Sequence, residues 1–178
     1  MKTATVNGVK LEYEEAGSGE PIVFIHGASV AETFVPLMKE PALARYRRIR
    51  YHRRGYGGSE HPGRTTNFHE QAADAAALVR HLGIGAAHVV GHSYGGLTAL
   101  RLALDSPSLV ATLSLLEPPM LATPMGPKFA EGSLGPVSPH RCGRPNCVLK
   151  FARSWRIVEP PNESMIAIVF PWPLLPAA

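Results

Sequence analysis

One serine in this sequence stands where a nucleophile is expected. Ser93 is the centre of the pentapeptide Gly91-His92-Ser93-Tyr94-Gly95, which matches the pattern G-x-S-x-G. An apolar run, "AAHVV", precedes the motif, and a helical pattern, "LTALRLAL", follows it. This context predicts that Ser93 lies on a tight turn between a strand and a helix, at the carboxyl edge of a sheet.

Small residues around this serine support the predicted turn. Gly91, Gly95 and Gly96 have no Cβ atom, so strand and helix can pass close to each other, and His92 completes this site-shaping group. The start of the helix directs N–H groups and the positive end of the helix dipole towards any anion that forms beside Ser93. The expected chemistry is nucleophilic attack followed by stabilisation of an oxyanion.

The segment "FIHGAS" (24–29) offers the other half of an oxyanion hole. It follows an apolar run, and backbone N–H groups at a strand end that contains a glycine, here Gly27, are suited to bind an oxyanion. We expect the N–H groups of Ala28 and Tyr94 to be the two donors. For His26, an orienting hydrogen bond is favoured over a direct catalytic role.

The rest of the sequence predicts the elements that would position these groups. An Asn-Gly pair at 7–8 indicates a hairpin, and apolar runs predict buried strands at 21–28, 86–93 and 109–119. Helical patterns lie between them, the clearest at 67–85 with a capping box that begins at Asn67. Alternating strands and helices predict an α/β fold, a mostly parallel sheet with helices on both faces.

Three motifs in this order resemble those of the α/β-hydrolase superfamily: "HGAS", "YHRRGYGGS" and "GHSYGG". The resemblance covers residues 5 to about 125. It implies an eight-stranded, mostly parallel sheet and a Ser-His-acid triad whose acid and histidine follow the serine in sequence. The family's dehalogenases and epoxide hydrolases carry aspartate at the nucleophile position, so a serine implies acyl transfer, such as hydrolysis of an ester or lactone. The family commonly has aspartate where this chain has His52. This position is outside the triad, so the difference affects the expected loop geometry more than the expected mechanism.

The remaining triad members have no obvious source in this chain. After Ser93 the only aspartate is Asp105, late in the next predicted helix, and the only histidine is His140, outside any predicted strand end. Glu117, at the end of a predicted strand, is the better candidate for the acid. The alternative interpretation of Glu117 is a residue that lines the pocket or ends the strand.

The sequence changes character towards its C-terminus. Residues 118–178 contain 12 of the 17 prolines, and we divide the chain into an α/β-hydrolase core at 1–136 and an atypical, poorly ordered tail at 137–178. One hypothesis is that the tail results from a shifted reading frame, which truncates the family's sequence and leaves the C-terminal strands incomplete. The competing hypothesis is a genuine short member that borrows its base from a partner chain or serves as a noncatalytic binding module.

Such a chain would leave a sheet edge unpaired. An exposed edge after the sixth strand favours association with another copy, so an oligomer is one expectation. The segment "SMIAIVF" (164–170) is the other candidate to cover that edge as a strand.

Composition excludes several other classes of function. The chain has 178 residues, 45% of them hydrophobic and 18% charged, as in a soluble globular protein. Residues 1–136 hold 13 Lys and Arg against 12 Asp and Glu, so most of the net charge of +4 belongs to the tail. The basic run at 45–58 is interpreted as a strand, because no signature of a nucleic-acid-binding module accompanies it.

No cofactor, metal, membrane or nucleic acid is therefore expected, and the predicted partner is a small acyl substrate. Cys142 and Cys147 with His140 lack the paired spacing of zinc modules. The N-terminus has no apolar signal region and no run is long enough to span a membrane, so a cytoplasmic location is the default expectation.

Overall fold

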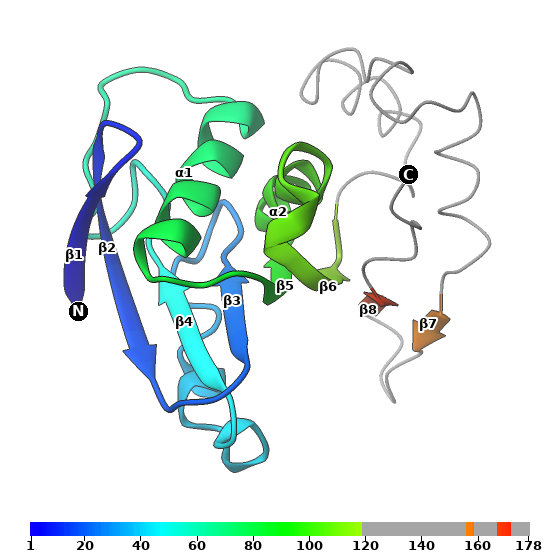
Figure 1. Cartoon of the computed structure of the whole chain (residues 1–178). Coiled ribbons are helices and arrows are strands. Elements are labelled where there is room, and N and C mark those ends of the chain that lie inside the picture. Colours follow the sequence, from blue (N-terminus) through cyan, green and yellow to red (C-terminus); the bar gives the residue numbers. More distant parts are fainter. Residues whose placement is uncertain (119–155, 159–166, 172–178) are drawn as a thin grey trace, which may run out of the picture.

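A computed structural model describes residues 1–118, 156–158 and 167–171 of the chain. They form one sheet with the strand order β1-β2-β4-β3-β5-β6-β8-β7 (Figure 1). Its strands are β1 (Lys2–Val6), β2 (Val9–Ala16), β3 (Pro21–Ile25), β4 (Arg47–Tyr51), β5 (Ala87–His92), β6 (Val110–Leu116), β7 (Arg156–Val158) and β8 (Ala167–Pro171).

The first two strands form the hairpin that the Asn-Gly pair predicts. Asn7 and Gly8 both adopt positive φ, 50° and 72°, as a tight two-residue hairpin turn requires. β2 then pairs antiparallel with β4, and β4 pairs parallel with β3, so β4 lies between strands that precede it in sequence.

The four central strands, β4, β3, β5 and β6, run parallel. Parallel strands end at the same edge of a sheet, so the segments that follow β3, β4 and β5 converge there. β3 is buried on both faces: Val23 and Ile25 pack on one side, while Ile22 and Phe24 pack on the other. This continuous apolar strand is what the run at 21–28 predicts.

Two α-helices, α1 (Phe68–His81) and α2 (Tyr94–Asp105), pack against each other on one face of the sheet (Figure 1). The capping box predicted for the first of them is present. Asn67 Oδ1 accepts from the N–H of Glu70, and the Glu70 carboxylate accepts from the N–H of Asn67. Gly83, with φ 68°, follows the end of α1.

Helices also cover the opposite face, as predicted, but they are of another type. Within residues 1–118 it is covered by two short 3₁₀ helices, η1 (Pro36–Lys39) and η2 (Pro41–Leu43), instead of an α-helix. Phe34 and Met38 pack there against Phe24. Each 3₁₀ helix begins with a proline, and the closely spaced prolines prevent a longer hydrogen-bonded run. A third 3₁₀ helix, η3 (Pro107–Leu109), joins α2 to β6.

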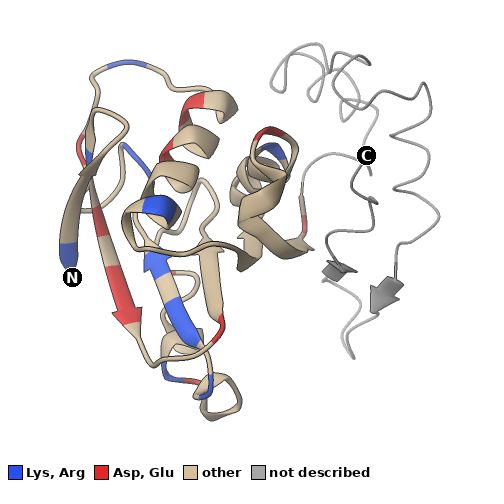
Figure 2. Ribbon diagram, in the orientation of Figure 1, with Lys and Arg blue, Asp and Glu red and all other residues tan. Residues whose placement is uncertain are grey.

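The densest basic run forms β4, as the sequence indicates. Ile49 and Tyr51 are buried in the core, while the arginines of β4 lie beside the glutamates of β2 (Figure 2). Arg47 Nε lies 2.6 Å from a carboxylate oxygen of Glu15, and Arg50 Nε lies 2.6 Å from one of Glu14. The positive charge of this strand is therefore largely paired within the sheet.

Beyond β6 the sheet continues through the C-terminal segment. β8 pairs antiparallel with β6, so residues 167–170 of the expected segment 164–170 cover this edge as a strand, while residues 164–166 lie outside the described residues. The last two strands are antiparallel, so the parallel part of the sheet is confined to its four central strands. The boundary expected at 136–137 and the two cysteines lie outside the described residues. No helix in the described part of the chain has the length and apolar character needed to cross a membrane.

Candidate active site

Ser93 occupies a strained turn between β5 and α2. Its φ of 50° and ψ of −122° lie in a region that residues other than glycine rarely adopt. The turn is fixed to the neighbouring strand, because the N–H of Ser93 donates to the carbonyl oxygen of Leu116 at 2.8 Å. The backbone strain that the elbow motif predicts is therefore present.

The turn requires glycines, because backbone atoms of other residues lie where the Cβ atom of any other residue would be. A Cβ on Gly91 would lie 2.5 Å from the carbonyl oxygen of Gly95, and one on Gly95 would lie 2.1 Å from that of Ile25. Gly96 is less constrained, with the nearest atom, the carbonyl oxygen of Gly91, at 3.3 Å. The close passage of strand and helix thus depends most on Gly95 and Gly91.

The loop after β3 approaches the elbow directly. A Cβ on Gly27 would lie 3.2 Å from Ser93 Cβ, so the two strand ends nearly touch. Ala28 follows at an exposed position, and Tyr94 is the first residue of α2. The N–H of a first helical residue has no partner within its helix. Both expected donors thus come from segments that meet beside Ser93.

His26 is buried and hydrogen-bonded to the backbone on both sides of its ring. Its Nδ1 lies 2.7 Å from the carbonyl oxygen of Gly27, and its Nε2 accepts from the N–H of Arg53 at 3.0 Å. This pattern assigns the ring proton to Nδ1. Burial, together with the positive charge of Arg53, lowers the pKa of His26 to about 3. The ring is neutral at physiological pH and orients the loop, as the sequence favours.

Arg53 is a part of this site that the sequence does not single out. Its residue is 1% exposed. Its guanidinium donates to three oxygens: the carbonyl of His26 at 3.0 Å, the carbonyl of Gly27 at 2.9 Å and the side chain of Gln71. Burial lowers its pKa, and no carboxylate among the described residues pairs with it. In the sequence, Arg53 is one of seven arginines between residues 45 and 64, and only the fold separates it from the others.

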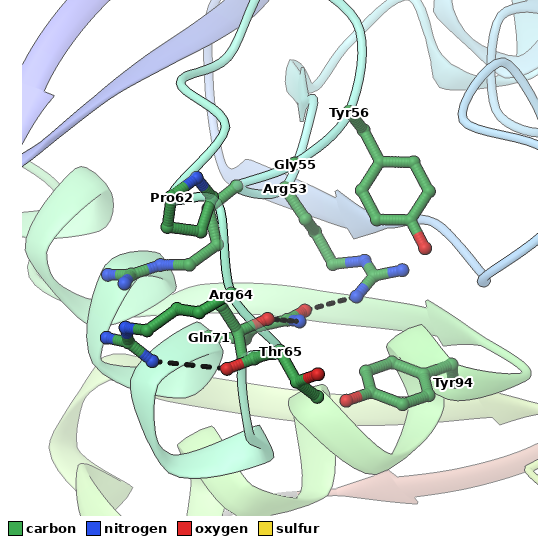
Figure 3. Close-up of a pocket in the computed structure, with 10 residues that line it drawn as sticks. Arg53, Gly55, Tyr56, Pro62, Arg64, Thr65, Gln71 and Tyr94 are labelled. Atoms are coloured by element: carbon green, nitrogen blue, oxygen red, sulfur yellow. Dashed lines mark hydrogen bonds between the residues drawn. The ribbon is translucent and has the colours of Figure 1, made fainter.

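A hollow of about 280 Å³ opens beside Arg53 (Figure 3). The guanidinium carbon of Arg53 lies 4.6 Å from the ring centroid of Tyr56 and 4.8 Å from that of Tyr94. Two further arginines on this wall are already paired: Arg54 with Asp74 through two contacts of 2.5 Å, and Arg64 with Glu70. Tyr94 also lines the hollow, which therefore adjoins the first residue of α2.

His52, where the resemblance implies an aspartate, is held between two carboxylates. Its Nδ1 lies 2.7 Å from a carboxylate oxygen of Glu12, and its Nε2 lies 2.8 Å from one of Glu32. Glu32 also accepts from Arg50 at 2.7 Å. The contacts connect β2 to the segment after β3, so they fix the far end of the loop that contains Ala28.

The expected acid does not lie beside a catalytic histidine in the described residues. Glu117, 43% exposed in its side chain, lies 3.6 Å from Nε2 of His92, the residue before the nucleophile. The Nδ1 atom of His92 is buried without a hydrogen-bond partner in this part of the chain. Asp105 pairs with Arg101 at 2.7 Å on the surface of α2. It therefore takes no part in the site.

No base for Ser93 is present among residues 1–118. Among residues 1–118, no side chain hydrogen-bonds to Ser93 Oγ. His140, the only histidine after Ser93, lies outside the described residues, and so do Cys142 and Cys147. Within the described residues there is no cluster of three or more His, Cys, Asp or Glu side chains that could hold a metal.

Comparison with known proteins identifies the fold family. The sequence profile of the alpha/beta hydrolase fold matches residues 20–143. The chain is 34% identical over 118 residues to a soluble epoxide hydrolase of Corynebacterium sp. strain C12, an alignment that covers 64% of this chain and 40% of the relative. It is 40% identical over 91 residues to a non-heme haloperoxidase of Rhodococcus erythropolis, covering 51% and 33% of the two chains.

A solved structure has a similar fold. The enol-lactonase from Burkholderia xenovorans LB400 superposes with a TM-score of 0.57 at 30% identity, and the match covers 61% of this chain and 44% of that one. The present chain spans less than half the length of each of these relatives. The part that the sequence profile matches, residues 20–143, nevertheless contains the strained serine turn and the loop after β3.

Proposed function

Because this chain belongs to the α/β-hydrolase fold family, we propose that it is a serine hydrolase unit that acts on an ester or a related small acyl substrate. The observation that carries the proposal is the backbone of Ser93, with φ 50° and ψ −122°, at the point where β5 meets α2. Strain of this kind persists only where the surroundings enforce it, and it presents the hydroxyl outside the strand and helix.

In the proposed reaction, Ser93 Oγ attacks the substrate's carbonyl carbon and its proton passes to a base. The carbonyl oxygen becomes an oxyanion that accepts hydrogen bonds from the N–H groups of Ala28 and Tyr94. Collapse of this intermediate breaks the bond to the leaving group, which receives the proton, and leaves an acyl group on Ser93. Water then repeats the sequence at the acyl carbon, releasing the acid and restoring the serine.

The type of nucleophile favours acyl substrates over the epoxides named for one relative. A serine alkoxide forms an ester that water can hydrolyse at its carbonyl carbon, whereas opening of an epoxide by serine would leave a stable ether. No histidine within residues 1–118 hydrogen-bonds to Ser93 Oγ, so the proposed reaction takes its base from the rest of the chain or from a partner chain. His140 is this chain's candidate and Glu117 its candidate acid.

The second candidate function is a catalytically incomplete fragment, or a noncatalytic binding module of the same fold. One observation favours it: Glu117 pairs with His92, and His92 stands next to the nucleophile in sequence without bonding to its hydroxyl. Such a protein would keep the elbow and the oxyanion loop and would turn over no substrate.

Labelling of the active serine separates the two candidates. A fluorophosphonate probe and a p-nitrophenyl ester are each applied to the wild-type chain and to Ser93→Ala. The proposal predicts labelling and turnover in the wild type and the loss of both in the variant, by several orders of magnitude for turnover. A folded wild-type protein that neither reacts with the probe nor hydrolyses the ester would instead identify the binding module.

A further inference from the structure

The burial of Arg53 is not explained by a contribution of this residue to the stability of the fold. The residue is 1% exposed, and within residues 1–118 its guanidinium meets carbonyl and amide oxygens and aromatic rings but no carboxylate. Burial of a charge without an ion pair is costly, and arginine is rarely so buried unless it is paired. A neutral side chain of similar length would avoid that cost, so we expect the positive charge to have a function other than stabilising the fold.

The contacts of Arg53 converge on one peptide group. Its Nη2 donates to the carbonyl oxygen of Gly27 at 2.9 Å, and His26 Nδ1 donates to that same oxygen at 2.7 Å. The N–H of this peptide group is that of Ala28, one of the two expected oxyanion donors. Two donors use both lone pairs of the Gly27 oxygen, so the orientation of the peptide plane is fixed.

Fixing the oxygen also fixes the direction of the donor. In a trans peptide the C=O and N–H bonds point in opposite directions, so the Ala28 N–H points away from Arg53 and His26. The loop lies against the elbow on another side, where a Cβ on Gly27 would be 3.2 Å from Ser93 Cβ. The charged donor therefore acts at the end of the peptide remote from the site of oxyanion formation.

The charge of Arg53 also changes the strength of that donor. Hydrogen bonds to an ionised donor are stronger than neutral ones, and successive hydrogen bonds polarise one another in a low-dielectric interior. A positive group on the Gly27 oxygen draws electron density from the peptide and makes the Ala28 N–H more positive. His26 belongs to the same chain of bonds, because its Nε2 accepts from the N–H of Arg53 at 3.0 Å.

The same side chain contacts the other expected donor residue. The guanidinium carbon lies 4.8 Å from the ring centroid of Tyr94, whose N–H begins α2 (Figure 3). Cation–π contact at this distance is attractive and restrains the ring. Arg53 thus touches the residues on both sides of the oxyanion position without reaching that position itself.

We propose that Arg53 is a positioning residue of the oxyanion hole: its guanidinium, bonded to the Gly27 carbonyl, sets the direction and the donor strength of the Ala28 N–H. The inference rests on the proposed hydrolase function for its catalytic consequence. Its structural content, an amide polarised by a remote charge, is independent of turnover.

The test compares Arg53→Met, which keeps the length and removes the charge, with Arg45→Met. Arg45 is the control, because its guanidinium also lies over a tyrosine ring, 5.0 Å from the centroid of Tyr46, but the residue is exposed. The first measurement is the amide proton shift of Ala28 by NMR. Loss of the charged bond is expected to move it upfield in Arg53→Met and to leave it unchanged in Arg45→Met.

The second measurement is kinetic. Because an oxyanion donor acts mainly in the transition state, Arg53→Met is expected to lower kcat for the p-nitrophenyl ester by about tenfold to a hundredfold while KM changes little. Arg53→Lys keeps the positive charge, but its ammonium group cannot make all three hydrogen bonds, so kcat should take an intermediate value. This variant also provides the test if Arg53→Met fails to fold. A loss that appears in KM alone would contradict the proposal.

The two readouts separate failure of this inference from failure of the proposed function. If the wild-type chain neither labels nor turns over ester, the hydrolase proposal fails, and the Ala28 shift still tests whether Arg53 polarises the peptide. If the folded Arg53 variants show the wild-type Ala28 shift, the inference is overturned whatever the activity.

Discussion

The nucleophile side of this site and its acid–base side are built in different ways. At the ends of β3 and β5, each important atom is fixed by residues close to it: the strain at Ser93 by adjacent glycines, and the Gly27 peptide by His26 and Arg53. At the end of β6, Glu117 is half exposed and contacts only His92 among the described residues. The proposed attacking and oxyanion-binding groups therefore all lie within the first 118 residues, whereas no base bonded to Ser93 lies among them.

This difference teaches that the two parts of the proposed serine hydrolase site draw on different lengths of chain. The elbow depends on backbone sterics and on backbone contacts made within residues 1–118. A general base must be brought to the serine from elsewhere in the chain, and its placement needs elements that are distant in sequence. A chain that contains the first half is recognisable as a family member without containing the second.

The largest expected effect comes from closing the space at the elbow. Gly95→Ala would place a Cβ 2.1 Å from the carbonyl oxygen of Ile25, a backbone atom that cannot move aside. We expect a loss of about 3 kcal/mol or more in the free energy of unfolding and no labelling of Ser93. Gly85→Ala is the matched control, since nothing lies within 4 Å of its Cβ position. Urea denaturation that gives the two variants equal stability would contradict the steric account.

The next effect is the pH dependence that His26 brings to the oxyanion loop. Burial and the charge of Arg53 lower its folded-state pKa from 6.5 to about 3. Between these values the unfolded chain binds a proton that the folded chain does not. Stability is therefore full above pH 6.5 and falls with decreasing pH, by about 1.4 kcal/mol per unit.

Denaturation of the wild type and of His26→Asn at several pH values measures this contribution. The variant should show a shallower decline between pH 6.5 and 5, where the wild type loses about 2 kcal/mol from this group. Parallel curves for the two proteins would mean that His26 is not held neutral in the fold.

The smallest effect is expected on the acid–base side. Glu117→Gln removes the charge from a side chain that is 43% exposed and 3.6 Å from His92, so the loss of stability should stay within about 0.5 kcal/mol. If Glu117 serves only to pair with His92, ester hydrolysis should fall by less than about threefold. A loss of several orders of magnitude would assign Glu117 the role of triad acid and would remove the contrast between the two regions.

Local features of the fold were predictable, because short-range rules determine them. The Asn7-Gly8 turn, the Asn67 capping box and the strand–turn–helix around Ser93 all follow from residues a few positions apart. The sequence also indicated that 164–170 would cover the edge of β6. Its antiparallel direction and the 3₁₀ helices at Pro36 and Pro41 were not predicted, because they depend on how the chain returns to the sheet.

The parts of the site that sequence analysis missed are long-range contacts. Arg53 is distinguished from its neighbours by the carbonyl groups of His26 and Gly27, which lie 27 and 26 positions earlier. His52 is likewise explained by Glu12 and Glu32, one on β2 and one in the loop after β3. No periodicity or motif within the run at 45–58 reveals either set of partners.

The most direct test of the central claim is mass spectrometry of the chain after treatment with a fluorophosphonate probe. The account predicts a single phosphonylated peptide that contains Ser93, and no modification in Ser93→Ala. A folded chain whose Ser93 peptide stays unmodified, or one labelled equally in the variant, would contradict the assignment of Ser93 as the nucleophile.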